Sequence, residues 1–61
     1  MELNHTAQKD GRLSDILQHE MRVSAGLMNR LKTTDRILVN GIPQRTNFAV
    51  RCGDTVTLLL D

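Results

Sequence analysis

Few residues of this chain have the types and spacing that catalysis or metal binding requires. His5 and His19 are far apart, and neither has a carboxylate or thiol at the spacing of a metal-ligand set, so we expect two surface histidines. The one cysteine, Cys52, follows Arg51, but the sequence supplies no partner base that would activate it as a nucleophile. The sequence therefore predicts no catalytic residue, no metal ion and no cofactor for this chain alone.

The residues that favour binding chemistry are mostly basic and gather in the middle of the chain. Five of the eight Lys and Arg residues fall between positions 22 and 45. Such side chains, together with the amide groups at a helix start, bind phosphate oxygens. The candidate nucleic-acid contacts are Arg12, Ser24, Asn29, Arg30, Lys32, Arg36, Asn40, Gln44 and Arg45. A solvated helix face that simply carries charge explains the same spacing about equally well.

The length and composition limit what such a chain can be. With 61 residues it forms one small domain over positions 1–61, with little room for an enclosed active site. Its net charge is only +1, so nucleic-acid affinity has to come from local clustering of basic residues. A single Phe largely excludes an aromatic base-stacking platform. A single cysteine excludes an internal disulfide, and no apolar run is long enough to span a bilayer. We therefore expect a cytoplasmic protein.

Two apolar stripes at helical spacing predict two short helices that would position part of the basic set. The first stripe consists of Leu13, Ile16, Leu17 and Met21, and the second of Leu27, Met28 and Leu31. Ser24 is placed as the N-cap of the second helix, with Val23 and Met28 as its hydrophobic staple. Neither helix is long enough to be stable alone, so both need a sheet to pack against.

The rest of the chain predicts strands. Residues 37–39 lead into Asn40-Gly41, a strong hairpin signal because both residues tolerate positive φ. Pro43 makes the second arm an edge strand. Gly53-Asp54 marks another turn before a strand over 55–60, and Glu2–Thr6 is a weaker strand candidate. The predicted fold is α+β, with two short helices packed on a small, mainly antiparallel sheet.

These elements, in this order, resemble a known family. The carriers of the resemblance are Gly11-Arg12-Leu13, Ser24, the run 36–41 and Gly53-Asp54. Together they are similar to the alpha-L RNA-binding motif, the domain named after small-subunit ribosomal protein four. The most similar version is the N-terminal domain of RluA/RluD-type pseudouridine synthases. The resemblance implies a strongly twisted sheet and a surface that docks structured ribosomal RNA for a separate catalytic domain of a larger enzyme. We also expect a monomer.

The chain departs from the family pattern at positions that affect RNA affinity. Ala25 stands where the family usually has Arg, and Asp35 stands where it usually has the Gly that ends the second helix. Ser14 stands where Asp is common. Asp tolerates the left-handed conformation better than most residues, so the fold is expected to survive. Losing an Arg and adding a carboxylate both weaken the attraction for phosphate.

Two other interpretations remain open. An Asn-Gly hairpin and a Gly-Asp turn before an aliphatic strand also look like ubiquitin-like sulfur carriers. Those proteins need a C-terminal Gly-Gly, whereas this sequence ends Leu59-Leu60-Asp61. A protein-interaction domain is the third interpretation, because Pro43 on an edge strand and an exposed Leu59 would suit a partner surface. We favour RNA binding over the sulfur carrier by roughly four to one.

Overall fold

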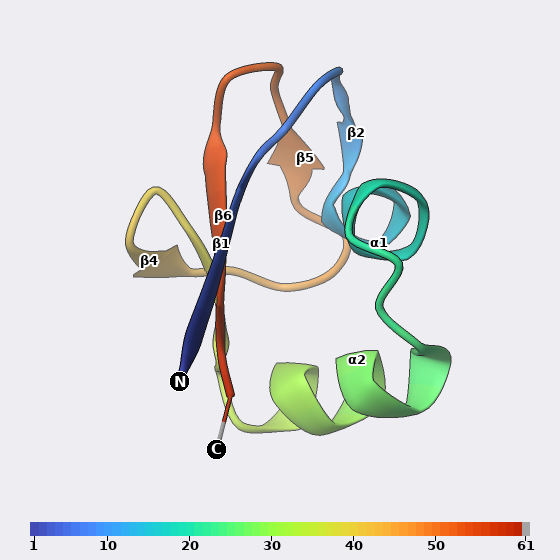
Figure 1. The fold of residues 1–61 in the computed structure, drawn as a ribbon, viewed down its shortest axis with the longest axis vertical. Coiled ribbons are helices and arrows are strands. Elements are labelled where there is room, and N and C mark those ends of the chain that lie inside the picture. The colour runs from blue at the N-terminus through green and yellow to red at the C-terminus, as the bar shows by residue number, and fades with distance from the viewer. Residues whose placement is uncertain (61) are drawn as a thin grey trace.

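The computed structural model describes residues 1–60 as a small α+β fold (Figure 1). Its elements are β1 (Glu2–Thr6), β2 (Gly11–Arg12), α1 (Leu13–Asp15), η1 (Ile16–Glu20), α2 (Ala25–Thr33), β3 (Ile37–Val39), β4 (Ile42–Pro43), β5 (Ala49–Val50) and β6 (Thr55–Leu59). Four strands form an antiparallel sheet in the order β1-β6-β3-β4, and β2 pairs with β5 separately. The predicted fold class is confirmed.

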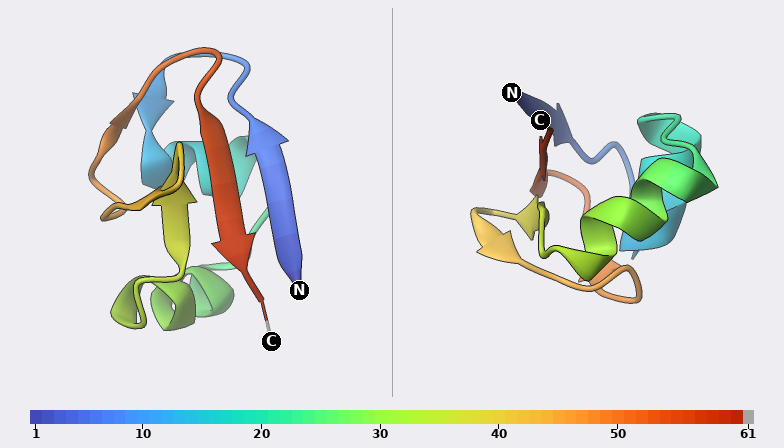
Figure 2. Two further views of the ribbon diagram at one scale, coloured as in Figure 1. Left: turned by 90° about the vertical axis from the view of Figure 1, so that its left-hand side faces the viewer. Right: turned by 90° about the horizontal axis from the view of Figure 1, so that it is seen from below.

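The helices cover one face of the four-stranded sheet and leave the other face open. In the left-hand view of Figure 2, β3, β6 and β1 lie in front, with α1 behind them and α2 across their lower end. The alternation of β6 explains this arrangement, because Val56 and Leu58 are buried while Thr55 is exposed and Thr57 is half-buried. Side chains alternate between the two faces of a strand, so one face of β6 enters the core.

The hairpin between β3 and β4 forms as predicted. Asn40 and Gly41 have φ values of 53° and 82°, and positive φ at both central positions is typical of the two-residue turns that join twisted strands. Val39 then pairs with Ile42, and Leu38 with Pro43. β4 is an edge strand of the sheet, which is where a residue without an N–H is tolerated.

The first helix buries three of the four residues of its predicted stripe, with Met21 only half-buried, and it is not a regular α-helix throughout. Leu13, Ile16 and Leu17 are buried as expected. The second half, η1, has π-helical geometry, and the N–H of Met21 donates to the carbonyl of Ile16 at 3.1 Å. Arg22 follows with a φ of 55°, which redirects the chain so that the next side chain enters the core.

The core joins the sheet, both helices and the β2–β5 ladder in one cluster. Its members are Ala7, Leu13, Ile16, Leu17, Val23, Met28, Leu31, Ile37, Val39, Val50, Val56 and Leu58. Burying an aliphatic side chain of this size contributes about 1.5–3 kcal/mol. The sequence did not predict the β2–β5 ladder, because two-residue strands have too few positions to show a periodicity.

Candidate functional site

The start of α2 is fixed by the predicted cap. Ser24 has extended backbone angles, and its hydroxyl oxygen accepts a hydrogen bond from the N–H of Leu27 at 3.2 Å. Val23 and Met28, on either side of this cap, are both buried in the core. A capping residue flanked by an apolar pair fixes the angle at which the chain enters a helix. The predicted N-cap of α2 is therefore confirmed.

This anchoring turns the polar side of α2 to solvent. Met28 and Leu31 are buried, whereas Asn29, Arg30 and Lys32 are exposed. Within residues 1–60 no carboxylate lies within ion-pair distance of Arg30 or Lys32. Both positive charges are therefore available to a ligand.

The turn after α2 carries the chain back across the end of the helix. Asp35 takes the left-handed conformation with a φ of 55°, and the N–H of Arg36 donates to the carbonyl of Leu31 at 3.0 Å. This 6→1 hydrogen bond after a left-handed residue is the Schellman arrangement of helix ends. The carbonyl of Arg36 accepts the N–H of Leu59 at 2.9 Å, so the turn also fixes Arg36 next to the end of β6.

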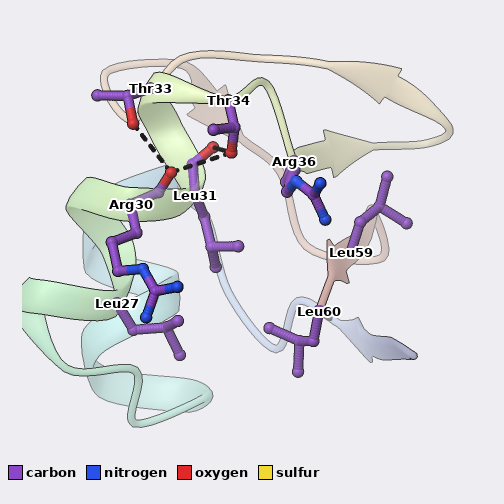
Figure 3. A pocket seen from close by; sticks show the side chains of 8 residues that line it. All are labelled: Leu27, Arg30, Leu31, Thr33, Thr34, Arg36, Leu59 and Leu60. Atoms are coloured by element: carbon purple, nitrogen blue, oxygen red, sulfur yellow. Dashed lines mark hydrogen bonds between the residues drawn. The ribbon is translucent and has the colours of Figure 1, made fainter.

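A hollow of about 360 Å³ opens between the second half of α2 and the end of β6. We call it the α2–β6 groove, and it is lined by Leu27, Arg30, Leu31, Thr33, Thr34, Arg36, Leu59 and Leu60. Figure 3 shows Leu27 and Arg30 on the helix side, Leu59 and Leu60 on the strand side, and Leu31 between them. The groove therefore combines leucine side chains with two arginines that the sequence selected as RNA contacts.

A second hollow of about 330 Å³ lies on the other side of the α2–β3 turn. We call it the β4 hollow, and its lining residues are Asp35, Pro43, Gln44, Arg45, Asn47 and Phe48. Gln44 and Arg45 from the predicted set line this hollow together with Asp35. Asp35 lines the β4 hollow, whereas its chain neighbours Thr34 and Arg36 line the α2–β6 groove, so the turn borders both hollows, and we call it the ridge.

The remaining predicted contacts lie outside both hollows. Ser24 is at the other end of α2, and Arg12 is exposed on β2. Asn40 is committed to internal hydrogen bonds: its Nδ2 donates to Asp54 at 3.2 Å and its Oδ1 accepts the N–H of Thr55 at 3.0 Å. The predicted contacts therefore do not form one continuous surface, and one of them, Asn40, instead holds the tip of the hairpin in place.

The charge of the molecule is unevenly distributed. Residues 22–45 include five basic residues and one acidic residue, a net charge of +4, whereas the rest of the chain has three basic and six acidic residues, a net charge of −3. The turns at 7–10 and 51–54 lie at the opposite end of the long axis from α2 (Figure 1). We call residues 22–45 the positive segment, and it comprises α2, the α2–β3 turn and the hairpin.

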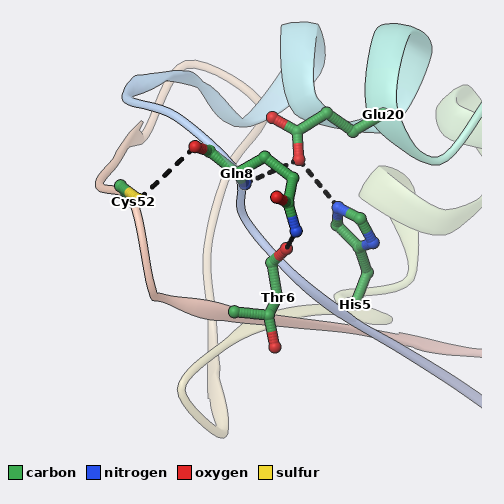
Figure 4. Close-up of polar contacts among 5 residues, drawn as sticks. All are labelled: His5, Thr6, Gln8, Glu20 and Cys52. Carbon is green, nitrogen blue, oxygen red and sulfur yellow. Dashed lines mark hydrogen bonds and ion pairs between the residues drawn. The ribbon is translucent and has the colours of Figure 1, made fainter.

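A polar contact near the other end corrects one prediction. His5 is half-buried, and its Nε2 lies 2.7 Å from Oε1 of Glu20, which also accepts the N–H of Gln8 at 2.8 Å (Figure 4). The expectation of a surface histidine at position 5 needs correction, because β1 lies beside the end of η1 and brings His5 against Glu20, although the two residues are 15 positions apart. The hydrogen bonds from His5 and from Gln8 lower the pKa of Glu20.

The same end holds the cysteine in a structural contact. The thiol of Cys52 is exposed and donates to the carbonyl of Gln8 at 3.4 Å, and its N–H donates to Asp10 at 2.8 Å. Nowhere in residues 1–60 do three His, Cys, Asp or Glu side chains gather as a metal site would require. No helix in the described part of the chain is long and apolar enough to cross a membrane.

What the sequence missed in the α2–β6 groove is its apolar side and its two threonines. The hydroxyls of Thr33 and Thr34 both donate to the carbonyl of Arg30 at 3.0 Å. Leu59 is half-buried in the groove and not freely exposed. In the sequence, only the polar residues at the end of α2 and the residues of β6 that alternate with its buried ones could have indicated this groove. Comparison with protein-family models, with curated proteins and with solved structures finds no match for this chain.

Proposed function

We propose that this chain is an RNA-binding module of the alpha-L type that docks structured RNA. The observation that carries the proposal is the positive segment over residues 22–45, with a net charge of +4 on a chain whose total is only +1. Phosphate contacts supply most of the sequence-independent affinity for nucleic acids. Arg30, Lys32 and Arg45 are exposed and have no carboxylate partner within residues 1–60, so they can meet phosphates without first breaking an ion pair.

The fold supports the same proposal. Two short helices on a mainly antiparallel sheet, a capped second helix and an Asn-Gly hairpin are the arrangement that the resemblance implies. Asp35 adopts the left-handed conformation at the position where the family usually has Gly. By that resemblance we further propose that the RNA is ribosomal and that the module serves a separate pseudouridine synthase domain. On this proposal the chain itself contributes positioning and no catalytic residue.

The test compares charge reversals at the two ends of the molecule. Fluorescence anisotropy would measure binding of a labelled helical-junction RNA to the wild type at several salt concentrations between about 50 and 200 mM. We expect affinity that falls as salt rises. Arg30→Glu combined with Lys32→Glu should weaken binding on the order of 100-fold, since two charge-assisted hydrogen bonds are lost.

The matched control is Lys9→Glu combined with Arg51→Glu, which changes the net charge equally but at the opposite end. We expect this control to weaken binding by less than about fivefold, because exposed charges are screened over about 10 Å at such salt. Urea unfolding would show that both double variants are folded. Absence of salt-sensitive binding by the wild type, or equal losses in the two variants, would contradict the proposal.

A further inference from the structure

The α2–β6 groove has a composition that phosphate binding alone does not explain. Leu27 and Leu31 enter it from α2, and Leu59 and Leu60 from the end of β6 (Figure 3). Its volume of about 360 Å³ falls within the range of small-ligand pockets. A groove whose only task was to meet phosphate would have no use for four leucines in its lining.

The groove also supplies polar groups at its rim. The guanidinium of Arg30 lies on the helix side, and Arg36 lies on the side of the turn. The hydroxyls of Thr33 and Thr34 give their protons to the carbonyl of Arg30, which leaves their oxygen lone pairs to accept hydrogen bonds from a ligand. The groove thus offers an apolar surface, the guanidinium of Arg30 and two hydroxyl acceptors together.

An RNA duplex presents phosphates and sugars and keeps the faces of its bases stacked. An unpaired nucleotide differs, because its base can be splayed out to place its flat face on a guanidinium plane or against apolar side chains. Its polar edge can then donate to hydroxyl oxygens, and its own phosphate can meet a nearby arginine. This combination matches the leucines, the threonine acceptors and Arg30 of the groove.

Resting on the proposed RNA-binding function, we propose that the α2–β6 groove receives one unpaired nucleotide of the RNA. The base lies against Leu27 and Leu59, and Arg30 binds the adjacent phosphate. No aromatic residue is needed, since leucine side chains and a guanidinium provide the contact surface. The remaining cations of the positive segment bind the flanking duplex.

The test uses two RNA hairpins of the same stem sequence, one fully paired and one with a single bulged 2-aminopurine. We expect the wild type to bind the bulged hairpin about tenfold more tightly than the paired one. Leu27→Ser and Leu59→Ser should abolish that preference while leaving the affinity for the paired hairpin unchanged. The control is Ile42→Ser, which removes an exposed aliphatic side chain on β4 outside the groove and should keep the preference.

A second measurement uses only the wild-type protein, so its result does not depend on whether the serine variants are stable. Methyl signals of Leu27 and Leu59 in the wild-type protein should shift with the bulged hairpin and not with the paired one. Equal, salt-sensitive binding of both hairpins would overturn the groove proposal and leave RNA binding intact. Failure to bind either hairpin would overturn both. Methyl shifts caused by a peptide of Glu and Leu, but not by the bulged hairpin, would reassign the groove to a protein partner.

Discussion

The two ends of this molecule use their charged side chains in opposite ways. At the end formed by the turns 7–10 and 51–54, carboxylates accept backbone hydrogen bonds, one between the two turns and one within the second turn. Asp10 accepts the N–H of Cys52 at 2.8 Å, and Asp54 accepts that of Arg51 at 3.0 Å. At the α2 end, Arg30 and Lys32 have no carboxylate partner in the described residues. Charge maintains the fold at one end and is left available for ligands at the other.

This difference indicates how each end is stabilised. The turns 7–10 and 51–54 are tied by a reciprocal pair of backbone hydrogen bonds, in which Ala7 donates to Asp54 and Gly53 donates to Ala7. The α2 end is attached mainly by apolar packing, through the buried side chains of Met28 and Leu31. A helix of nine residues has too little intrinsic stability to persist without such packing.

The largest effect is expected where that packing is removed. Leu31→Ala should lower the free energy of unfolding by about 2–5 kcal/mol, because Leu31 is 4% exposed and leaves a cavity. A chain of this length has a total stability on the order of 3–9 kcal/mol, so the variant should lose a large fraction of it. Urea denaturation followed by circular dichroism would measure the change.

The matched control for this prediction is Leu27→Ala on the same helix. Leu27 is only half-buried, so its loss should cost less than about half as much. Equal costs for the two variants would mean that α2 is not attached mainly through its buried residues Met28 and Leu31, and the contrast between the two ends would then be wrong.

The sequence predicted the parts of the fold that depend on local rules. Ser24 as an N-cap and Asn40-Gly41 as a turn were recognisable because one residue type satisfies a local backbone requirement. The left-handed Asp35 was expected from the family pattern. The π-helical turn of η1 and the β2–β5 ladder were not predictable, because they depend on how distant segments meet.

The candidate site was predictable in its residue types but not in its arrangement. Arg30 and Arg36 line the same groove, whereas Arg45 lines the β4 hollow together with Asp35. The His5–Glu20 contact was missed because sequence spacing says nothing about pairs that tertiary packing brings together. Leu59 was expected to be exposed, whereas it is half-buried and borders the groove together with Leu60.

Acid should destabilise the end that uses carboxylates. The pKa of Asp54 is lowered by the hydrogen bonds from Arg51 and Asn40, and the pKa of Glu20 by those from His5 and Gln8. Because each folded-state pKa lies below its unfolded value, the unfolded chain takes up protons first as the pH falls. The free energy of unfolding should therefore decrease from roughly pH 5 downward and level off below the folded-state pKa values.

Urea unfolding between pH 3 and pH 7 would measure this loss in the wild type, Glu20→Gln and Asp54→Asn. Each amide variant should be less stable at neutral pH and should show a shallower acid dependence. In NMR titrations the amide signals of Gln8 and Arg51 should follow the carboxylates that they bind, whereas those of Arg30 and Lys32 should not. An unchanged acid dependence in both variants would show that the hydrogen bonds to Glu20 and Asp54 do not cause the loss of stability in acid.

The smallest effect is expected at the ridge between the hollows, where backbone and charge can be separated. Asp35→Gly should raise the free energy of unfolding by about 0.5 kcal/mol, because glycine adopts the φ of 55° without a Cβ penalty but loses more chain entropy on folding. Removing the carboxylate should also raise RNA affinity, by about threefold, since a phosphate near the ridge meets one less negative charge.

Asp35→Asn is the control, because asparagine removes the charge and keeps the side-chain shape. If the carboxylate opposes RNA, both variants gain affinity while only the glycine variant gains appreciable stability. A gain of affinity confined to Asp35→Gly would assign the effect to the backbone of the turn, and the two ends would then differ in conformation as well as in charge.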